Sequence, residues 1–446
     1  MTGHHTTSGS PFTPHSAEET EAMLESIGVD DVEALFDIPE KVRYDGELGI
    51  EARDEPTIKA EIASMLGRNE DMVELLGRGH YDHYVPSVVD QLSGRSEFLT
   101  SYTQYQAEVT QGFLQALFEF QSMLRELTGL GVVNCSMYDA PSAIGEAATL
   151  ASRVRETSGN RVLVPDILQD KRRDVIENYV AGPEMPVDTY PTEDGNVDLD
   201  GLRSAMDEDV VMVYVESPTA RGTIEEHVAE VGELTDEFDA MFTLGSDPIA
   251  LAMLEEPAAH GVDTVVGEAD VLGLPTSYGM GTGLFATKKD YVRQVPGRLV
   301  GVSEDSNEKR SFTLTLQTRE QHIRRERATS NICTNQAWVA LRIAMHMALL
   351  GPSGMLELAT ESVERAADLA ERVDEIDGIE APVHDRHHFR EFVARTEAPA
   401  GQIADDLGEE GFAVHVLGEN ELQFCVTGVS DDELDDFVST LSEVTA

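Results

Sequence analysis

Hydrophobic positions along this chain follow two spacings. Between residues 109 and 127 they recur every three or four positions and stop at Gly129, which predicts a long amphipathic helix with a glycine C-cap. Short apolar runs then predict buried strands at Val132–Met137, Arg161–Pro165, Val210–Ser217, Ala240–Leu244 and Thr264–Val266. Helical spacing separates these runs, at Ser142–Arg155, Ile167–Val180, Ile224–Phe238 and Ile249–Ala259. Repeated alternation of this kind predicts an α/β fold with a mainly parallel sheet.

The two ends of the chain have different patterns. Residues 16–75 favour short charged helices, with breaks at Pro39 and Pro56 and helix ends at Gly67 and Gly77. Near the C-terminus, a helix capped by Thr334 or Asn335 is expected to run to Leu350 and stop at Gly351-Pro352. The remaining elements are predicted as a helix at Met355–Val373, a strand at Phe389–Arg395, a helix near Gln402–Leu407, strands at Phe412–Leu417 and Leu422–Thr427, and a helix from Asp431.

These patterns predict three regions. Residues 1–65 form a polar tail and an N-terminal helical arm, residues 66–325 a large α/β domain, and residues 326–446 a smaller α+β C-terminal domain. A large α/β domain followed by a small one is the layout of fold-type-I enzymes that use pyridoxal phosphate, although a layout alone says little about function.

Charge narrows the range of partners. The chain has 84 acidic residues against 32 basic ones, for a formal net charge of -52, and only six of the basic residues are lysines. Acidic excess spread along the whole chain is typical of adaptation to a high-salt cytoplasm, where salt screens the repulsion. Nucleic acid is an improbable partner for such a surface. With no apolar run long enough to cross a bilayer and no secretory signal, we expect a cytoplasmic protein.

Cysteine and histidine add little chemistry. Cys135, Cys333 and Cys425 are too few and too scattered for a disulfide framework or a zinc site, and they fit a reducing compartment. Histidines near the N-terminus are irregularly spaced, so no metal site is predicted. Cys333 has no identifiable base beside it and is not expected to act as a nucleophile.

Positive charge gathers in one segment, Gln317–Gln336, which reads QTREQHIRRERATSNICTNQ. On charge alone the segment could be a solvated helix face with ordinary ion pairs. It could also bind an anion, since arginine offers planar bidentate donors. Glu320 and Glu326 are close enough in sequence to pair internally, which favours a structural role for most of its arginines.

Several strings together resemble one family. They are LTLQTREQHIRRERATSNICTNQ at Leu314–Gln336, GRLVG at Gly297–Gly301, FLTSYTQYQAEVTQGFLQALFEFQ at Phe98–Gln121, and HYDHYVPSVV at His80–Val89 preceded by Gly77 and Gly79. The resemblance is to the glycine cleavage system P-protein, in its split form, subunit 1, and it extends from about residue 55 to the C-terminus. Gln104 and Ala107 depart from the family by replacing two prolines, which loosens that loop.

The resemblance implies a fold-type-I large domain and an activity shared between two subunits. In that family, glycine is decarboxylated on pyridoxal phosphate and the aminomethyl group passes to the lipoyl group of the H-protein. The implied assembly is a heterodimer or α2β2 complex with subunit 2. The cofactor is expected on subunit 2, because a pyridoxal-phosphate enzyme holds it as an imine on one lysine.

That lysine is missing here. The loop after the strand Thr264–Val266 is GEADVLGLP, and Asp270 aligns with the family's imine-forming lysine. Lys288 and Lys289 lie after the next strand, too far along to substitute. We therefore expect no catalytic residue on this chain alone and no covalent cofactor.

The remaining site candidates fall into two groups. Asp247 could be a vestige of the aspartate that pairs with the pyridine nitrogen, or a turn residue. Ser142 could mark a former phosphate site at a helix start, or an ordinary N-cap. At the implied subunit interface the candidates are Tyr102, Tyr105, Gln106, Glu108, Arg325, Asn331, Thr334 and Asn335. Each tyrosine could instead belong to the core.

Three hypotheses follow. The chain could complete an interfacial site on subunit 2, or it could be a catalytically silent scaffold or regulator. The least favoured hypothesis is an independent pyridoxal-phosphate enzyme with an unusual lysine.

Overall fold

The computed structural model describes residues 15–36, 38–44, 46, 49–69, 71–79, 81–99, 104–275, 281–315, 332 and 336–445. The chain forms two compact units, residues 1–70 and residues 71–446. The first unit contains helices α1 (Ala17–Ile27) and α2 (Glu55–Leu66) and the short 3-10 helices η1 (Glu33–Leu35) and η2 (Glu40–Val42). Among its described residues only Leu24 is a buried apolar side chain.

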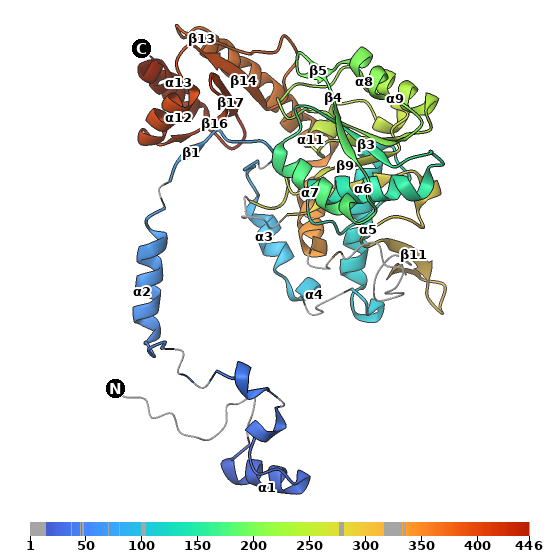
Figure 1. The fold of residues 1–446 in the computed structure, drawn as a ribbon, viewed down its shortest axis with the longest axis vertical. Helices are drawn as coiled ribbons and strands as arrows, with labels where there is room; N and C mark the ends of the chain where they lie inside the picture. Colours follow the sequence, from blue (N-terminus) through green and yellow to red (C-terminus); the bar gives the residue numbers. More distant parts are fainter. Residues whose placement is uncertain are drawn as a thin grey trace. The chain divides into compact units, whose positions relative to one another are not determined.

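The second unit is built on a seven-stranded sheet of order β2-β10-β9-β8-β7-β3-β4 (Figure 1). The strands are β2 (Val132–Val133), β3 (Arg161–Pro165), β4 (Val187–Tyr190), β7 (Val210–Glu216), β8 (Met241–Gly245), β9 (Thr264–Glu268) and β10 (Gly283–Thr287). Strand β10 is antiparallel to both of its neighbours, and the other pairings are parallel. The predicted mainly parallel α/β sheet is therefore confirmed.

Helices cover both faces of this sheet. Helices α6 (Ala140–Val154) and α7 (Asp170–Ala181) contribute to one apolar cluster, and α5 (Gln111–Thr128), α8 (Leu199–Ala205) and α9 (Val228–Glu237) contribute to another. The predicted long helix is confirmed as α5, which ends at Gly129 in the left-handed conformation (φ 68°). It starts two residues after Val109, which lies in the short 3-10 helix η3 (Ala107–Val109).

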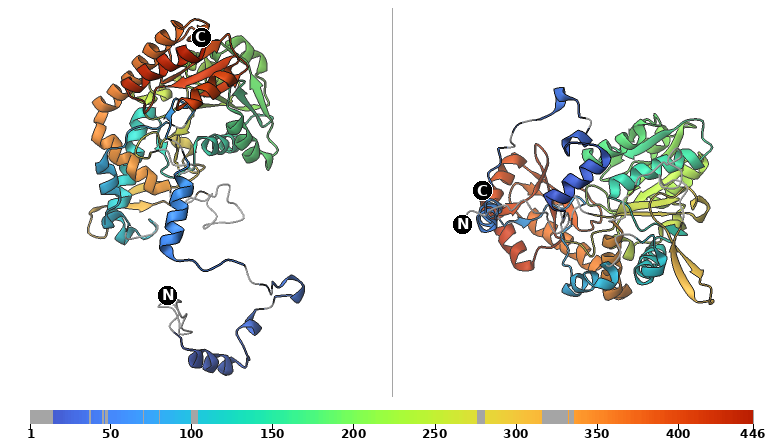
Figure 2. Two further views of the ribbon diagram at one scale, coloured as in Figure 1. Left: turned by 90° about the vertical axis from the view of Figure 1, so that its left-hand side faces the viewer. Right: turned by 90° about the horizontal axis from the view of Figure 1, so that it is seen from below.

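A smaller four-stranded sheet of order β13-β14-β17-β16 lies near the C-terminus (Figure 2). Its elements are β13 (Ile379–Glu380), β14 (Glu391–Thr396), β16 (His415–Gly418), β17 (Glu421–Cys425), α12 (Ala400–Glu409) and α13 (Asp431–Thr445). These elements enclose an apolar cluster of their own, which agrees with the predicted α+β layout. The domain limits at residues 65 and 325 stay a prediction.

One long helix, α11 (Gln336–Asp374), contributes to two apolar clusters: the one that contains α5, α8 and α9, and the one enclosed by the small sheet and its helices. It is broken at Gly351 (φ 61°, ψ -179°), followed by Pro352, as the sequence predicted. By length and composition alone α11 could cross a membrane, but half of its most apolar 18-residue window is buried inside the protein. Packing against α5 and α3 (Ser87–Ser93) accounts for much of its apolar character.

Several predictions about elements were wrong or incomplete. The stretch Ile249–Ala259 holds two separate 3-10 helices, η4 (Ala250–Ala252) and η5 (Pro257–His260), because Pro257 starts a new element. The sequence patterns did not reveal β4, α8, the hairpin β5 (Thr192–Glu193) and β6 (Asn196–Val197), or the hairpin β11 (Val300–Glu304) and β12 (Arg310–Leu314). These elements are short or half-exposed and lack a clear apolar period.

Gly77 does not end a helix. It follows the two-residue strand β1 (Val73–Glu74), which pairs with β15 (Phe412–Ala413), and it has a positive φ of 59°. A Cβ atom at Gly77 would lie 2.6 Å from the Glu391 carboxylate, and one at Gly79 would lie 2.5 Å from the Arg172 guanidinium. The loop therefore needs glycine to approach two charged side chains, not to terminate a helix.

Candidate functional site

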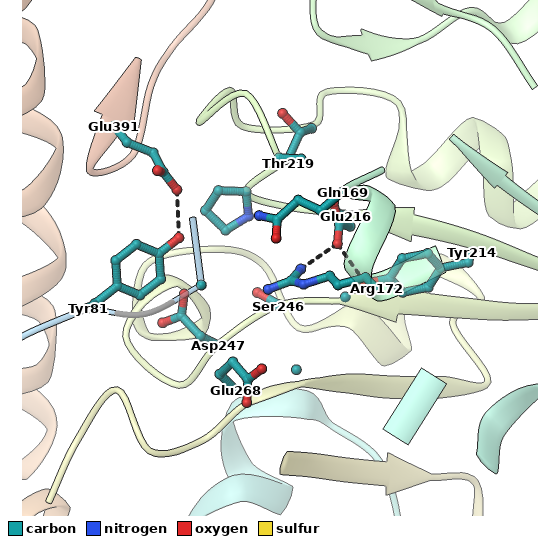
Figure 3. A pocket seen from close by; sticks show the side chains of 15 residues that line it. Tyr81, Gln169, Arg172, Tyr214, Glu216, Thr219, Ser246, Asp247, Glu268 and Glu391 are labelled. Atoms are coloured by element: carbon teal, nitrogen blue, oxygen red, sulfur yellow. Dashed lines mark hydrogen bonds and ion pairs between the residues drawn. The ribbon is translucent and has the colours of Figure 1, made fainter. Parts of the chain in front are cut away.

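A small polar cavity lies at the carboxyl edge of the large sheet (Figure 3). Strands β7, β8 and β9 end there, at Glu216, Gly245 and Glu268. Ligands of open α/β sheets bind at this edge, outside the carboxyl ends of the strands. The cavity is therefore where the fold would place a cofactor, and its volume is about 50 Å³.

Asp247 lies in this cavity just past the end of β8, where the sequence placed it. Its carboxylate accepts hydrogen bonds from Arg390 Nη2 at 2.8 and 3.0 Å. The same carboxylate accepts the backbone N–H groups of Ile249 and Ala250 at 2.9 and 3.1 Å. Asp247 is thus both a turn residue and half of a buried ion pair.

Arg390 is the other half of that pair and is fully buried. Its guanidinium carbon lies 4.1 Å from the centre of the Tyr81 ring and 4.5 Å from that of Phe389, so aromatic faces enclose it. Burial opposes the charge, but the nearby Asp247 carboxylate raises the pKa of Arg390 above its ordinary value. The arginine is held charged in the interior by its partner.

A second ion pair crosses the cavity from α7. Arg172 Nη1 lies 2.6 Å from Glu216 Oε1, which also accepts the Tyr214 hydroxyl at 2.9 Å (Figure 3). Burial and the Glu216 charge raise the pKa of Tyr214 well above its usual range. Glu216 Oε2 is buried and accepts no hydrogen bond from the residues that the structure describes. A polar cavity of this volume suits water molecules.

Glu391 ties the small sheet to the glycine loop beside the cavity. Its carboxylate accepts the Tyr81 hydroxyl at 2.6 Å, the backbone N–H of Arg78 at 3.0 Å and the Gln423 amide at 2.9 Å. Burial raises the pKa of Glu391, although these hydrogen bonds oppose the shift. Together with the Arg390–Asp247 pair, these contacts link the start of β14 to the edge of the large sheet.

Asp270 lies in the loop after β9, and its Oδ1 accepts the backbone N–H of Thr282 at 3.3 Å. Burial, and then the negative charge of Asp270, raise the pKa of the neighbouring Glu268 to about 8. The end of β9 and this loop therefore carry two neighbouring carboxylates, Glu268 and Asp270, and no lysine.

All six lysines belong to the described residues, and none of them lines the cavity. Lys288 Nζ lies 2.6 Å from Asp263 Oδ1. Asp263 immediately precedes β9, whereas Asp270 follows that strand, so this ion pair lies at the opposite edge of the sheet. Lys288 therefore does not reach the cavity.

The residues of this cavity do not fit pyridoxal phosphate. No lysine reaches it, and Asp247 is already bound to Arg390. Its volume of about 50 Å³ is also far below the range of typical cofactor pockets, roughly 300–1,000 Å³.

Ser142 is not the N-cap that the sequence indicated. Helix α6 begins at Ala140, and Asp139 caps it by accepting the Ser142 backbone N–H at 2.8 Å. Ser142 is buried in the first turn of the helix. A carboxylate at this helix start competes with any anion for the free N–H groups.

Tyr105 lies away from the cavity and is half-exposed, so it is not the core residue that the sequence left open. Its hydroxyl oxygen accepts a hydrogen bond from Arg298 Nη2 at 3.0 Å. Arg298 is buried, and its guanidinium carbon lies 5.8 Å from the Tyr105 ring centre. Gln106 and Glu108 beside it are exposed.

Five of the interface candidates lie outside the described residues: Tyr102, Arg325, Asn331, Thr334 and Asn335. The sequence reasoning missed Arg172, Arg390, Glu391 and Arg298 as site residues. For two of these regions the sequence did contain a feature that could have pointed to the site. Gly77 and Gly79 marked the loop that approaches Glu391 and Arg172, and the GRLVG string contains Arg298.

The strand order and the cavity at the carboxyl ends of the strands indicate a class of fold before any particular family. The fold is that of fold-type-I pyridoxal-phosphate enzymes, here with no lysine among the residues that line the described cavity. A sphingosine-1-phosphate lyase from Burkholderia pseudomallei shares this fold, with a TM-score of 0.64 at 14% identity over 91% of this chain and 93% of that one.

The particular family follows from closer matches. A model of the glycine cleavage system P-protein matches residues 10–441, so this chain belongs to that family. The probable glycine dehydrogenase (decarboxylating) subunit 1 of Halobacterium salinarum is 59% identical over 438 residues, covering 98% of this chain and 99% of that protein. The crystal structure of an inhibitor-bound glycine decarboxylase (P-protein) superposes with a TM-score of 0.87 at 37% identity, covering 98% of this chain and 100% of that one.

Proposed function

We propose that this chain is the subunit of glycine dehydrogenase (decarboxylating) that does not carry the cofactor. One observation carries the proposal: a P-protein family member along nearly its whole length has a cofactor cavity with no lysine and two internal arginine ion pairs. Pyridoxal phosphate would be held by a lysine-bearing subunit 2. Glycine and the lipoylated H-protein would act at that partner's site, in a heterodimer or an α2β2 assembly.

The chain's own contribution would come from its surface. Tyr105 is half-exposed, and its hydroxyl is fixed by the buried Arg298. A positioned tyrosine next to a guanidinium suits a substrate carboxylate or a phosphate. Arg325, Asn331, Thr334 and Asn335 stay candidates for the same role, as do Tyr102, Gln106 and Glu108. We expect all of them to reach the partner's site across the interface.

The cellular setting is part of the proposal. Buried thiols at Cys135 and Cys425 and the acidic composition support a reducing cytoplasm of high ionic strength. Fractionation of the native cells would test this.

Borohydride trapping tests where the cofactor is held. The two subunits would be co-expressed, incubated with pyridoxal phosphate, reduced with borohydride, digested and analysed by mass spectrometry. The phosphopyridoxyl group should appear on a lysine of subunit 2 and be absent from this chain. A stoichiometric adduct on this chain would overturn the assignment and favour an independent pyridoxal-phosphate enzyme.

A scaffold role is the second candidate, and the small cavity filled by internal ion pairs favours it. Tyr105→Phe in the reconstituted complex distinguishes the two roles. Loss of one hydrogen bond in the site should lower kcat/KM by up to about tenfold, with assembly unchanged. The matched control is Tyr84→Phe, at another exposed tyrosine, which should retain full activity. Normal turnover for both variants would support the scaffold.

A further inference from the structure

The N-terminal arm, defined as the described residues between 15 and 69, exposes an unusual amount of apolar surface. Twelve large side chains other than tyrosine are exposed there: Met23, Ile27, Val32, Leu35, Phe36, Ile38, Val42, Ile50, Ile58, Ile62, Met65 and Leu66. The full sequence from residue 15 to residue 69 contains 15 acidic residues and only five basic ones. A strongly solvated segment therefore also carries a large apolar surface.

On α2 this apolar surface is ordered as a stripe. Ile58, Ile62, Met65 and Leu66 follow the i, i+4, i+7, i+8 spacing of one helix face, and they are 44–62% exposed. Helices of folded proteins bury such a face. No residue of α2 is buried, so no described residue of its own unit covers the stripe.

The helices of the arm are specified by local contacts, not by a core. Ser16 and Glu19 form a reciprocal capping box at α1, and Gly28 closes that helix in the left-handed conformation (φ 72°). Asp54 caps α2 by accepting the Thr57 N–H at 2.9 Å. Such preformed helices lose little conformational entropy on binding, so they suit recognition.

We propose that the arm docks through this stripe onto the lysine-bearing partner subunit. The inference rests on the proposed function, which supplies the partner. The available area is sufficient when the whole arm takes part: its twelve exposed side chains, each about half-exposed, together offer roughly 600 Å² of apolar surface. One side of a standard interface buries about 800 Å², of which a little over half is apolar. The arm alone can therefore supply one side of a stable contact.

The charge of the arm sets the salt dependence of this contact. Two acidic proteins repel each other at low ionic strength, and salt screens that repulsion while apolar burial persists. The arm should therefore hold the partner more tightly in molar KCl than in dilute buffer. A contact made by ion pairs would show the opposite trend.

The test is the affinity of the full chain for the co-expressed partner subunit in molar KCl, measured for two matched variants. Ile58→Asp with Ile62→Asp places two charges on the stripe. Ala60→Asp with Ser64→Asp places the same charges, with the same spacing, on the opposite face of α2. The stripe variant should weaken the complex roughly 30-fold or more, as loss of central apolar anchors does. The control variant should bind like the wild type.

Three outcomes would overturn the proposal. If both variants bind the partner like the wild type, the stripe does not dock there. If the stripe variant lowers the thermal stability of the isolated chain, the stripe packs on this chain itself. If it abolishes self-association of the isolated chain, the occupant is a second copy. Absence of any complex with wild-type chain would refute the proposed function as well, which separates the two failures.

Discussion

The cavity and the N-terminal arm differ in which side chains they bury and which they expose. In the cavity, charged groups are buried and satisfied by one another: Arg390 by Asp247, and Arg172 by Glu216. In the arm, apolar groups are exposed and the described residues give them no core. The region at the carboxyl edge of the sheet is therefore small and filled by its own ion pairs, whereas the arm has apolar surface available for a contact. Function in this chain should be sought at its interfaces.

The largest effect on stability is expected from breaking the buried ion pair between Arg390 and Asp247. Arg390→Met leaves the Asp247 carboxylate buried without its charged partner and should lower the free energy of unfolding by about 3–5 kcal/mol. Urea or thermal unfolding of the isolated chain at high salt measures this. Arg395→Met on β14 is the control, because its partner Glu380 is exposed and the loss should stay within about 1 kcal/mol.

Adding Asp247→Asn to Arg390→Met should restore part of the lost stability, because the unpaired charge is then removed. Equal costs for Arg390→Met and Arg395→Met would show that the cavity is not held by its internal pairing.

A smaller effect is expected from Glu268, and it depends on pH. Its pKa is about 8 in the folded chain, against about 4.3 in an unfolded one. Between these values the folded state binds more protons than the unfolded state, so stability falls as pH rises through this window. Glu268→Gln removes that dependence. Relative to wild type, the variant should gain about 3 kcal/mol between pH 5.5 and 8.5.

Unfolding at both pH values measures the difference, with Glu230→Gln on the exposed face of α9 as the control. Parallel pH profiles for Glu268→Gln and wild type would contradict a protonated Glu268 in the cavity.

The smallest effect is expected from restoring the lysine. Asp270→Lys in the isolated chain should give no imine with added pyridoxal phosphate, because the cavity holds only about 50 Å³ and Arg390 occupies Asp247. Absorbance and borohydride trapping provide the measurement. A trapped adduct at position 270 would show that only the lysine was missing, and the contrast between cavity and arm would then lose its basis.

Sequence reasoning succeeded where the determining forces are local. The glycine stop of α5 and the break at Gly351-Pro352 follow from backbone preferences of single residues, and β3 and β7 follow from continuous apolar runs. That Asp270 takes the place of an imine-forming lysine stays a prediction. The position of Asp247 at a strand end followed from the strand prediction.

The ion pairs among the side chains that line the cavity could not be predicted from the sequence in the same way. Arg390 is 143 residues from Asp247 in sequence, and Arg172 is 44 residues from Glu216. No spacing rule links such pairs, and in a chain rich in acidic residues most arginines have many candidate partners. The capping role of Asp139 in place of Ser142 was missed for a different reason, since both residue types favour helix starts.

The break in α11 has a consequence for how the chain tolerates change in length. Residues of α11 up to Ala359, on both sides of the break, pack in the cluster of the large sheet, and residues from Ala366 onward pack in that of the small sheet. An α-helix turns about 100° per residue, so one inserted or deleted residue on either side would rotate an apolar face out of its cluster. At Gly351 itself, φ 61° and ψ -179° are open almost only to glycine, although no atom would touch an added Cβ. The orientation of the small sheet therefore depends on the number of residues in α11 and on the glycine at position 351.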